Sequence, residues 1–331
     1  MSIPSVTPFH RAFAGHPLPV LIRAAGDKAC RRFLEFFTAN IRNRNTRAAY
    51  ASAVARFCDW CETRRFSLDL IEPISVAAYI EQLTKTHAAP TVKQHLAAIR
   101  MLFDWLVIGQ IVPHNPCASV RGPRHVVKRG KTPVLSAEDA RTLLDSISIA
   151  RKMPDGTSVP DLAGLRDRAL IAVMVFSFAR VSAVVGMDGL HFYQNGKRWW
   201  FRLHEKGGKF HEVPAHHLAV NYLQEYLRAT SFDRAAPLFP SAIGRSHRLG
   251  TDRMSRSDAL RMIKRRARAA GLSPTTCCHT FRATGITAYL SNGGTIEKAQ
   301  AIAAHESPRT TKLYDRTSDE IAVDEVEKIR I

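Results

Sequence analysis

The sequence lacks an uninterrupted apolar run of the ~18 residues that a membrane-spanning helix needs. Its longest candidate covers residues 169–179 and ends at Arg180. Residues 1–26 contain arginine, histidine and several prolines without a clean apolar segment, so this N-terminal extension does not resemble a signal peptide. We therefore expect a cytoplasmic protein without a membrane partner.

The sequence also lacks a cysteine pattern typical of a disulfide framework, because its six cysteines are scattered. Cys58 and Cys61 form a C-x-x-C pair, but a zinc site would need a second pair of ligands nearby, and none is obvious. Both lie inside an apparent helix, which favours buried thiols over metal ligands. Internal repeats and low-complexity segments are missing as well.

Acidic residues are scarce relative to basic ones. There are 29 Asp and Glu against 48 Lys and Arg, which gives a net charge of +19 and a pI of about 10.2. A merely basic soluble protein is one interpretation. An excess of this size favours a polyanionic partner, since neutralising phosphates releases condensed counterions. The charge therefore predicts a nucleic-acid-binding protein, which we expect to be associated with the nucleoid.

The first half of the chain reads as helical only. Apolar residues recur at helical spacing in residues 27–41, 45–65, 74–85 and 89–109. Asn45 is the expected cap of the second segment, and the fourth has Pro90 near its start and Gly109 at its end. We expect a small helical domain over residues 27–117, followed by a basic linker over 118–132 that contains proline, glycine and no acid.

The second domain is expected over residues 133–318. Ser136 and Asp139 resemble a capping box at its first helix, and a long apolar helix is expected over 165–185. Asn195-Gly196 and Gly207-Gly208 mark the turns of a three-stranded antiparallel meander. Further helices are expected over 217–229, 255–270, 280–291 and 295–303, with a tail at 319–331. The fold class is mainly α with a small β meander.

The chemistry is concentrated near the C-terminus. His279 and Arg282 are three residues apart, so a helix presents both on one face. If one helix continued from His305 to Tyr314, the two would lie about 13 Å apart at ~1.5 Å per residue. Ser307-Pro308, a cap followed by a proline at the first helical position, predicts a turn that brings Tyr314 back toward His305. Taken alone, an H-x-x-R pair or a single tyrosine is also typical of an ordinary surface.

Metal-free phosphodiester exchange needs a nucleophile, cations for the non-bridging oxygens and an acid for the leaving 5′-oxygen. The order of motifs here resembles the tyrosine recombinases, the phage-integrase family, over roughly residues 27–320. The motifs that carry the resemblance are "SFARVSAVVGM", "HEKGGKFHEVP", "HTFR", "AAH" and "TTKLYDR". They place the family's catalytic positions at Arg180, Lys206, His279, Arg282, His305 and Tyr314.

The resemblance implies a DNA clamp, in which a SAM-like helical core-binding domain and a catalytic domain close on duplex DNA. It implies that Tyr314 attacks the scissile phosphate and forms a 3′-phosphotyrosine. Arg180 and Arg282 would hold the non-bridging oxygens, and His279 and His305 would donate hydrogen bonds or move protons. Lys206 would protonate the 5′-oxygen, the alternative being a solvated hairpin tip. Neither a cofactor nor a metal is implied.

Three positions depart from the family pattern. Ala183 stands where an acidic residue usually follows the first arginine, so another group would have to orient its neighbours. His211 and Ala283 stand where arginine and histidine are common. The expected DNA contacts lie on the fourth helix and in the linker; they are Thr91, Lys93, Gln94, Arg100, Arg121, Arg124, Lys128 and Arg129. An ordinary helix surface is a nearly equal alternative for the first four.

The resulting prediction is a site-specific recombinase of a mobile element, plasmid or chromosome, with a specific duplex site and a homotetrameric synapse as partners. Apolar residues in the tail would dock on a neighbouring protomer; they are Ile321, Val323, Val326 and Ile329. A type IB topoisomerase-like enzyme and a DNA-binding regulator with relic catalytic residues are the alternatives. The helical first domain and short tail favour the recombinase, and the intact catalytic set disfavours the regulator.

Overall fold

The structure is a computed structural model that describes residues 13, 15–125, 130, 132–205, 210–230, 233–244 and 246–315. The chain divides into two compact units, Met1–Val127 and Lys128–Ile331. The division falls inside the basic segment 118–132. Among the described residues, no helix is both long and apolar enough to cross a membrane.

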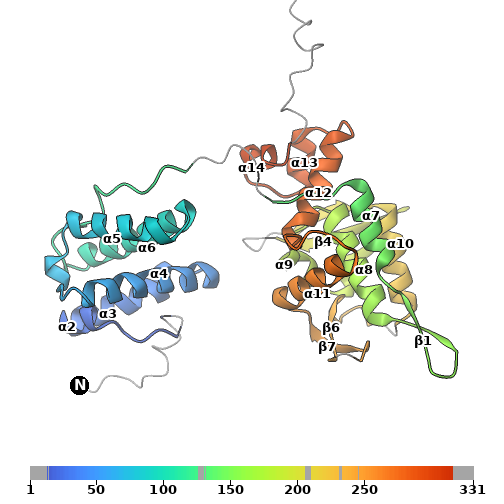
Figure 1. Ribbon diagram of the computed structural model, residues 1–331, viewed down its shortest axis with the longest axis horizontal. Coiled ribbons are helices and arrows are strands. Elements are labelled where there is room, and N and C mark those ends of the chain that lie inside the picture. Colours follow the sequence, from blue (N-terminus) through green and yellow to red (C-terminus); the bar gives the residue numbers. More distant parts are fainter. Residues whose placement is uncertain are drawn as a thin grey trace, which may run out of the picture. The chain divides into compact units, whose positions relative to one another are not determined.

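The first unit is built from helices (Figure 1). They pack around a core that is rich in aromatic side chains. α6 packs against α3, α4 and α5, and α2 packs against α3 and α4. The elements are α2 (Val20–Ala24), α3 (Asp27–Glu35), a π turn (Phe36–Asn40), α4 (Arg44–Glu62), a 3-10 turn (Leu68–Leu70), α5 (Pro73–Thr86) and α6 (Ala89–Ile108). The helical character expected of this part of the chain is confirmed, and α2 is an additional short helix.

The caps of these helices follow the sequence with one exception. α6 has proline in its first turn and Gly109 as its C-cap, as predicted. Asn45 is not the cap of α4, because the side chain of Asn43 accepts from the amides of Asn45 at 2.9 Å and Thr46 at 3.2 Å. The helix begins one residue before the predicted cap, since Asn43 satisfies the free amide groups of its first turn.

The second unit surrounds the apolar helix α8 with other helices (Figure 1). α7, α9, α10 and α12 pack against α8, whose segment Leu170–Met174 is almost completely buried. The helices are α7 (Ala137–Ser146), α8 (Leu162–Phe176), α9 (Val181–Val185), a 3-10 turn (Gly189–His191), α10 (His217–Arg228), α11 (Arg256–Ala269), α12 (Cys278–Ser291), α13 (Ile296–Ile302) and α14 (Pro308–Lys312). Ser136 caps α7 by accepting from the Asp139 amide at 2.9 Å, as predicted.

Three small antiparallel sheets complete this unit. The central one has the order β3-β4-β5, with Phe201 paired to Phe192 and to Val213. The predicted hairpin is present, but its two turn residues are Gly196 and Lys197, because Asn195 still belongs to β3 and pairs with Arg198. Two hairpins, β1-β2 and β6-β7, were not predicted from the sequence. The strands are β1 (Ala150–Lys152), β2 (Ser158–Pro160), β3 (Phe192–Asn195), β4 (Arg198–His204), β5 (Phe210–Pro214), β6 (Pro240–Ala242) and β7 (Leu249–Arg253).

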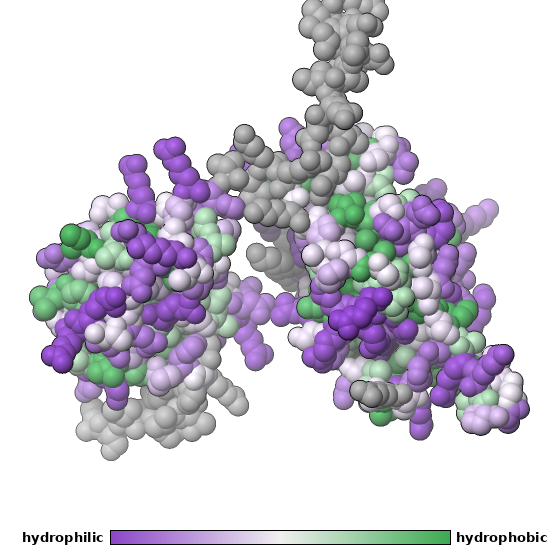
Figure 2. Space-filling view, in the orientation of Figure 1, coloured by the Kyte–Doolittle hydropathy of each residue, from purple (hydrophilic) through white to green (hydrophobic). Residues whose placement is uncertain are grey.

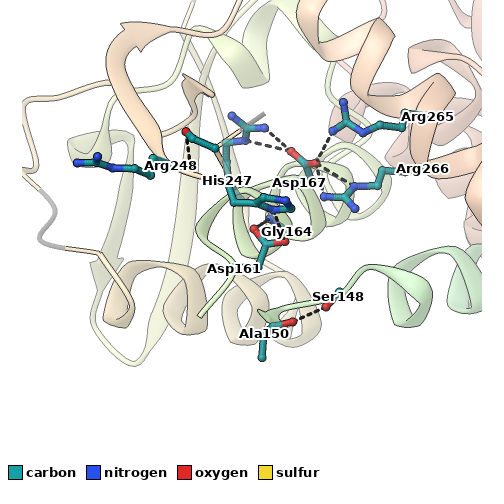
Figure 3. A network of polar contacts seen from close by, with 11 residues as sticks. Ser148, Ala150, Asp161, Gly164, Asp167, His247, Arg248, Arg265 and Arg266 are labelled. Carbon is teal, nitrogen blue, oxygen red and sulfur yellow. Dashed lines mark hydrogen bonds and ion pairs between the residues drawn. The ribbon is translucent and has the colours of Figure 1, made fainter. Parts of the chain in front are cut away.

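A buried charge cluster ties α8 to α11 and β6 (Figure 3). The fully buried carboxylate of Asp167 accepts from Arg166 at 2.5 Å, from Arg266 at 2.8 Å and from Arg265 at 3.3 Å. Arg166 also donates to the Pro240 carbonyl at 2.7 Å. Burying a charge is costly unless it is paired, so these bonds fix the relative positions of the three elements.

Hydrophilic side chains cover most of the visible face of each unit, with only scattered apolar patches (Figure 2). The buried apolar side chains form a separate core in each unit. A smaller cluster lies beside α12, α13 and Tyr314. This smaller cluster positions the predicted nucleophile.

Candidate active site

Arg180 lies at a break between two helices. The predicted single helix 165–185 is wrong, because α8 ends at Phe176 and α9 begins after Arg180, its N-cap. Buried Ser177 donates its hydroxyl to the Val173 carbonyl at 2.6 Å, and Phe178 adopts a φ of 54°. A non-glycine residue in this left-handed region costs of order 1–2 kcal/mol. The turn redirects the chain and brings Arg180 to the site.

Arg282 is held by the backbone of that same turn. Its side chain is 1% exposed and donates to the carbonyls of Phe178 and Ala303, the latter at 2.6 Å. α12 can approach α8 this closely because it has Gly285, where an added Cβ would lie 2.1 Å from the Val175 carbonyl oxygen. Arg282 therefore connects the end of α8 with the end of α13 and has a fixed orientation before any substrate arrives.

His305 is fixed from both sides. Its backbone amide donates to the Gln300 carbonyl at 3.1 Å, and its own carbonyl accepts from the Gln300 side chain at 3.0 Å. Its Nδ1 lies 2.9 Å from the hydroxyl of buried Thr311 on α14. The preceding residue, Ala304, has a φ of 46°, which turns the chain out of α13. The ring is consequently 7% exposed and held in one orientation.

Tyr314 is folded back toward both histidines. Ser307 caps α14 and Pro308 is in its first turn, as predicted. The phenol oxygen of Tyr314 lies 2.7 Å from Nε2 of His279, and its ring stacks on His305 with centroids 5.9 Å apart. Thr287 also donates to the Tyr314 carbonyl at 3.0 Å. The predicted turn is confirmed, since a continuous helix would separate His305 and Tyr314 by about 13 Å.

The electrostatics of the site favour neutral forms of the titrating groups. Burial, followed by the positive charges of Arg282 and Arg180, lowers the pKa of His305 to about 3 and also lowers the pKa of His279. Burial raises the pKa of Tyr314, although both arginines oppose this effect. At neutral pH the site therefore holds a protonated phenol beside a neutral imidazole, which can accept the phenol proton.

Glu205 is a site residue that the sequence interpretation missed. It follows β4 directly, is 8% exposed, and pairs with Nη1 of Arg180. Ala183, at the position where the family has an acidic residue, is buried and contributes no carboxylate. The only sequence signal was an acid next to Lys206 at the end of a predicted strand. His211 on β5 contacts the Ile302 carbonyl at 3.0 Å, which connects the sheet to the segment before His305.

The other predicted residues lie either outside the described residues or in the first unit. Lys206, Lys128, Arg129 and the tail residues lie outside the described residues. Lys93 and Gln94 are exposed on α6, Thr91 is half-buried, and Arg121 and Arg124 are exposed. Arg100 donates to the Cys117 and Val120 carbonyls at 3.2 and 2.7 Å, which gives it a structural role in the first unit.

Cys58 and Cys61 are buried on α4, as predicted, and burial raises the pKa of Cys61 to about 12. Within the described ranges, no group of three or more His, Cys, Asp or Glu side chains is arranged to hold a metal ion. The described site residues can support proton transfer and anion binding around Tyr314.

Comparisons with known proteins agree with this geometry. Residues 134–320 match the profile of the phage integrase family, and residues 30–111 match a phage integrase N-terminal SAM-like domain. The chain is 26% identical over 293 residues to tyrosine recombinase XerD of Chlorobaculum tepidum, covering 87% of this chain and 91% of that protein. It is 30% identical over 266 residues to tyrosine recombinase XerC of Chlamydia muridarum, covering 77% and 76%.

Among solved structures, a lambda integrase tetramer bound to a Holliday junction has the same fold. Its TM-score is 0.64 at 16% identity, and the alignment covers 95% of this chain and 87% of that one. The two profile matches follow the division of the chain into a helical unit and a unit that contains Tyr314. On these grounds the chain belongs to the phage integrase family, that of the tyrosine recombinases.

Proposed function

We propose that this protein is a site-specific DNA recombinase that cleaves and rejoins duplex DNA through a 3′-phosphotyrosine. The observation that carries the proposal is the 2.7 Å contact between the Tyr314 hydroxyl and His279 Nε2, beside the guanidinium groups of Arg180 and Arg282. A nucleophile, a base and two fixed cations are the groups that attack on a phosphodiester needs.

In the proposed cleavage step, the Tyr314 oxygen attacks the scissile phosphorus while its proton passes to His279. The bond between phosphorus and the 5′-oxygen breaks, and that oxygen takes a proton from Lys206. Arg282 and Arg180 stabilise the charge that grows on the non-bridging oxygens, because a planar guanidinium can bind two oxygens and stays charged. His305 donates through its Nε2 side, since Thr311 occupies Nδ1.

Rejoining is the reverse reaction. A 5′-hydroxyl, from the same or another strand, attacks the phosphotyrosine and releases the Tyr314 phenol. One phosphoester bond forms as another breaks, so the step needs neither ATP nor a metal ion to conserve bond energy. We propose that exchange takes place in a homotetramer on a specific duplex site in the nucleoid. The lambda integrase tetramer, which shares this fold, supports this arrangement.

We also propose a division of labour along the chain. Residues 27–117 would bind DNA, and residues 118–132 would follow its backbone through Arg121, Arg124, Lys128 and Arg129. Residues 133–318 would carry the chemistry. Segment 319–331 would dock on a neighbouring protomer through its apolar residues. The exposed Lys93 and Gln94 on α6 would face a DNA groove, where base edges can be read.

The nucleophile is tested with nicked suicide duplexes. A library with randomised arms is incubated with the wild-type protein, and protein-linked DNA is selected to obtain a cleavable site. The nick releases a short 5′-hydroxyl strand after cleavage, so the adduct accumulates on a denaturing gel. We expect Tyr314→Phe to abolish the adduct while DNA binding is retained.

The control is Tyr289→Phe, which removes the hydroxyl of another tyrosine in the same unit and should leave the adduct unchanged. An adduct that persists in Tyr314→Phe would identify a different nucleophile. A wild-type protein that binds the library but never becomes linked to DNA would contradict the recombinase proposal and favour a DNA-binding regulator.

A further inference from the structure

Glu205 is a buried carboxylate in a site that is expected to bind an anion. Its side chain is 7% exposed and pairs with Arg180, whose side chain is 34% exposed. A carboxylate so close to a phosphate site would repel the substrate, and burying it without a partner would be costly. Its presence therefore needs a reason beyond ordinary surface charge.

Among the described residues near Arg180, no other carboxylate pairs with its guanidinium. Arg180 is the N-cap of the five-residue helix α9, and its side chain makes no capping hydrogen bond. The position one turn further along α9 is Ala183, which is 1% exposed and has no polar atom in its side chain. Orientation of the guanidinium must therefore come from another element, and the ion pair supplies it from the end of β4.

The anchor itself is rigid. β4 is the central strand of its sheet and is paired on both sides, with Phe201 and Leu203 completely buried. Glu205 follows directly after this strand, so its backbone starts from a fixed position. Fixed supporting groups are what allow a functional side chain to keep a productive orientation.

The carboxylate also counteracts the repulsion between two like charges. Arg180 lies close enough to Arg282 to lower its pKa, which burial already lowers, and the pKa of Arg282 falls to about 10. The charge of Glu205 acts on Arg282 in the opposite direction. Before DNA binds, Glu205 thus offsets the repulsion between the two guanidinium groups.

We propose that Glu205 is a positioning residue that holds Arg180 ready to bind the scissile phosphate. The ion pair with Glu205 uses Nη1 of Arg180, and a guanidinium has five N–H donors in one plane, so donors remain for phosphate oxygens. Glu205 thereby supplies from β4 the carboxylate that α9 does not carry at position 183. This inference rests on the proposed function.

The test compares Glu205→Gln with Glu212→Gln on the selected suicide duplex. Glu212 forms an exposed ion pair with Arg202 on the same sheet, so it is a matched control for losing one carboxylate. We expect Glu205→Gln to slow adduct formation by about tenfold to a hundredfold, the usual cost of removing a supporting partner, with DNA affinity little changed. Glu212→Gln should cleave at the wild-type rate.

Two further measurements separate positioning from a merely structural role. The first is a double-mutant cycle with Arg180→Gln, in which the two losses should not add, because Glu205 acts through Arg180. The second is a duplex with a neutral methylphosphonate at the scissile position, where strand release is measured. With one negative charge removed, the losses of Arg180→Gln and Glu205→Gln should both shrink.

Glu205→Asp covers the case in which the glutamine variant unfolds, since it keeps the charge and should recover part of the rate. Cleavage by Glu205→Gln at or above the wild-type rate would overturn the inference. So would a loss that adds fully to that of Arg180→Gln, or one that stays undiminished on the methylphosphonate. The absence of any wild-type adduct would instead contradict the proposed function itself.

Discussion

The two units bury different kinds of side chain. The interior of the first unit is apolar and aromatic, with the ring of Phe37 in contact with those of Phe33 and Phe36. Its buried polar side chains among the described residues are Ser75 and His95. The second unit buries charges and hydroxyls as well. These are Asp161, Arg166, Asp167, Ser177, Glu205, Thr276, Thr280, Arg282, Thr284, His305 and Thr311.

The difference shows what each interior is for. Apolar packing alone is enough to hold a helical unit that presents a basic surface. A site that moves protons and binds a phosphate must hold charged groups away from water, and each such group needs a partner to offset its burial. Two sets of these buried groups, one around Asp167 and one around Tyr314, should respond differently to mutation.

The largest expected effect is on stability and comes from Asp167→Ala. Removing the carboxylate leaves Arg166 and Arg266 buried without their counter-charge, so the catalytic unit should lose about 3–5 kcal/mol. Calorimetry of the two-unit chain should show one transition moving to lower temperature while the other stays in place. Asp258→Ala, which breaks the exposed pair with Arg261, should cost ~1 kcal/mol or less. Equal losses for the two variants would contradict the buried-pair explanation.

The next effect is a pH dependence from His305. Its pKa is lowered in the folded state to about 3, so between pH 6.5 and 3 the unfolded chain binds the proton and the folded chain does not. Stability from this group is full above pH 6.5 and falls by about 1.4 kcal/mol for each pH unit below it. Urea unfolding at pH 7.0 and 5.5 should show this loss for the catalytic unit.

His305→Gln should remove that part of the acid sensitivity, while His217→Gln, an exposed histidine of the same unit, should keep it. The first unit contains a separate acid-sensitive histidine, His95, which is hydrogen-bonded to Tyr79. Burial lowers the pKa of His95 to about 4. The loss of stability of the first unit at acid pH should therefore be the same in His305→Gln and His217→Gln. An unchanged pH profile of the catalytic unit in His305→Gln would contradict the buried neutral state.

The smallest effect concerns the first unit, where no charged group is involved. Asn43→Ala should destabilise α4 by about 1 kcal/mol, because two amides lose their acceptor. Asn45→Ala should have almost no effect, since its side chain is not the cap. Thermal unfolding of the two variants measures the difference. A larger loss for Asn45→Ala would restore the prediction made from the sequence.

The parts of the site that were predicted from sequence are those with a local signal. Ser307-Pro308 specifies its turn through the conformation that proline allows, and Gly196 specifies the first hairpin turn, one residue later than the predicted pair. The break before Arg180 could not be predicted in this way. It depends on the left-handed conformation of Phe178, a position where the sequence has neither the glycine nor the asparagine that usually marks such a conformation. It also depends on the hydrogen bond from Arg282 to the Phe178 carbonyl.

The same limit applies to partners. The pairing of Arg180 with Glu205 joins two elements 25 positions apart, and Asp167 is bound by arginines about a hundred positions away. Such contacts follow from how helices and strands pack, which a spacing pattern does not contain. Sequence reasoning thus proposed a set of site residues from their order and spacing, while the carboxylate that pairs with Arg180 came from the structure.

The bond between Tyr314 and His279 joins residues of one chain, and Thr287 of the same chain holds the Tyr314 backbone. Under the proposed reaction, each protomer would therefore cut with its own tyrosine and borrow none from a neighbour. A single bound copy could open and reseal its strand without net change. Recombination would then require an assembly, because a second protomer supplies a second cleaved strand, whose 5′-hydroxyl the first protomer can join.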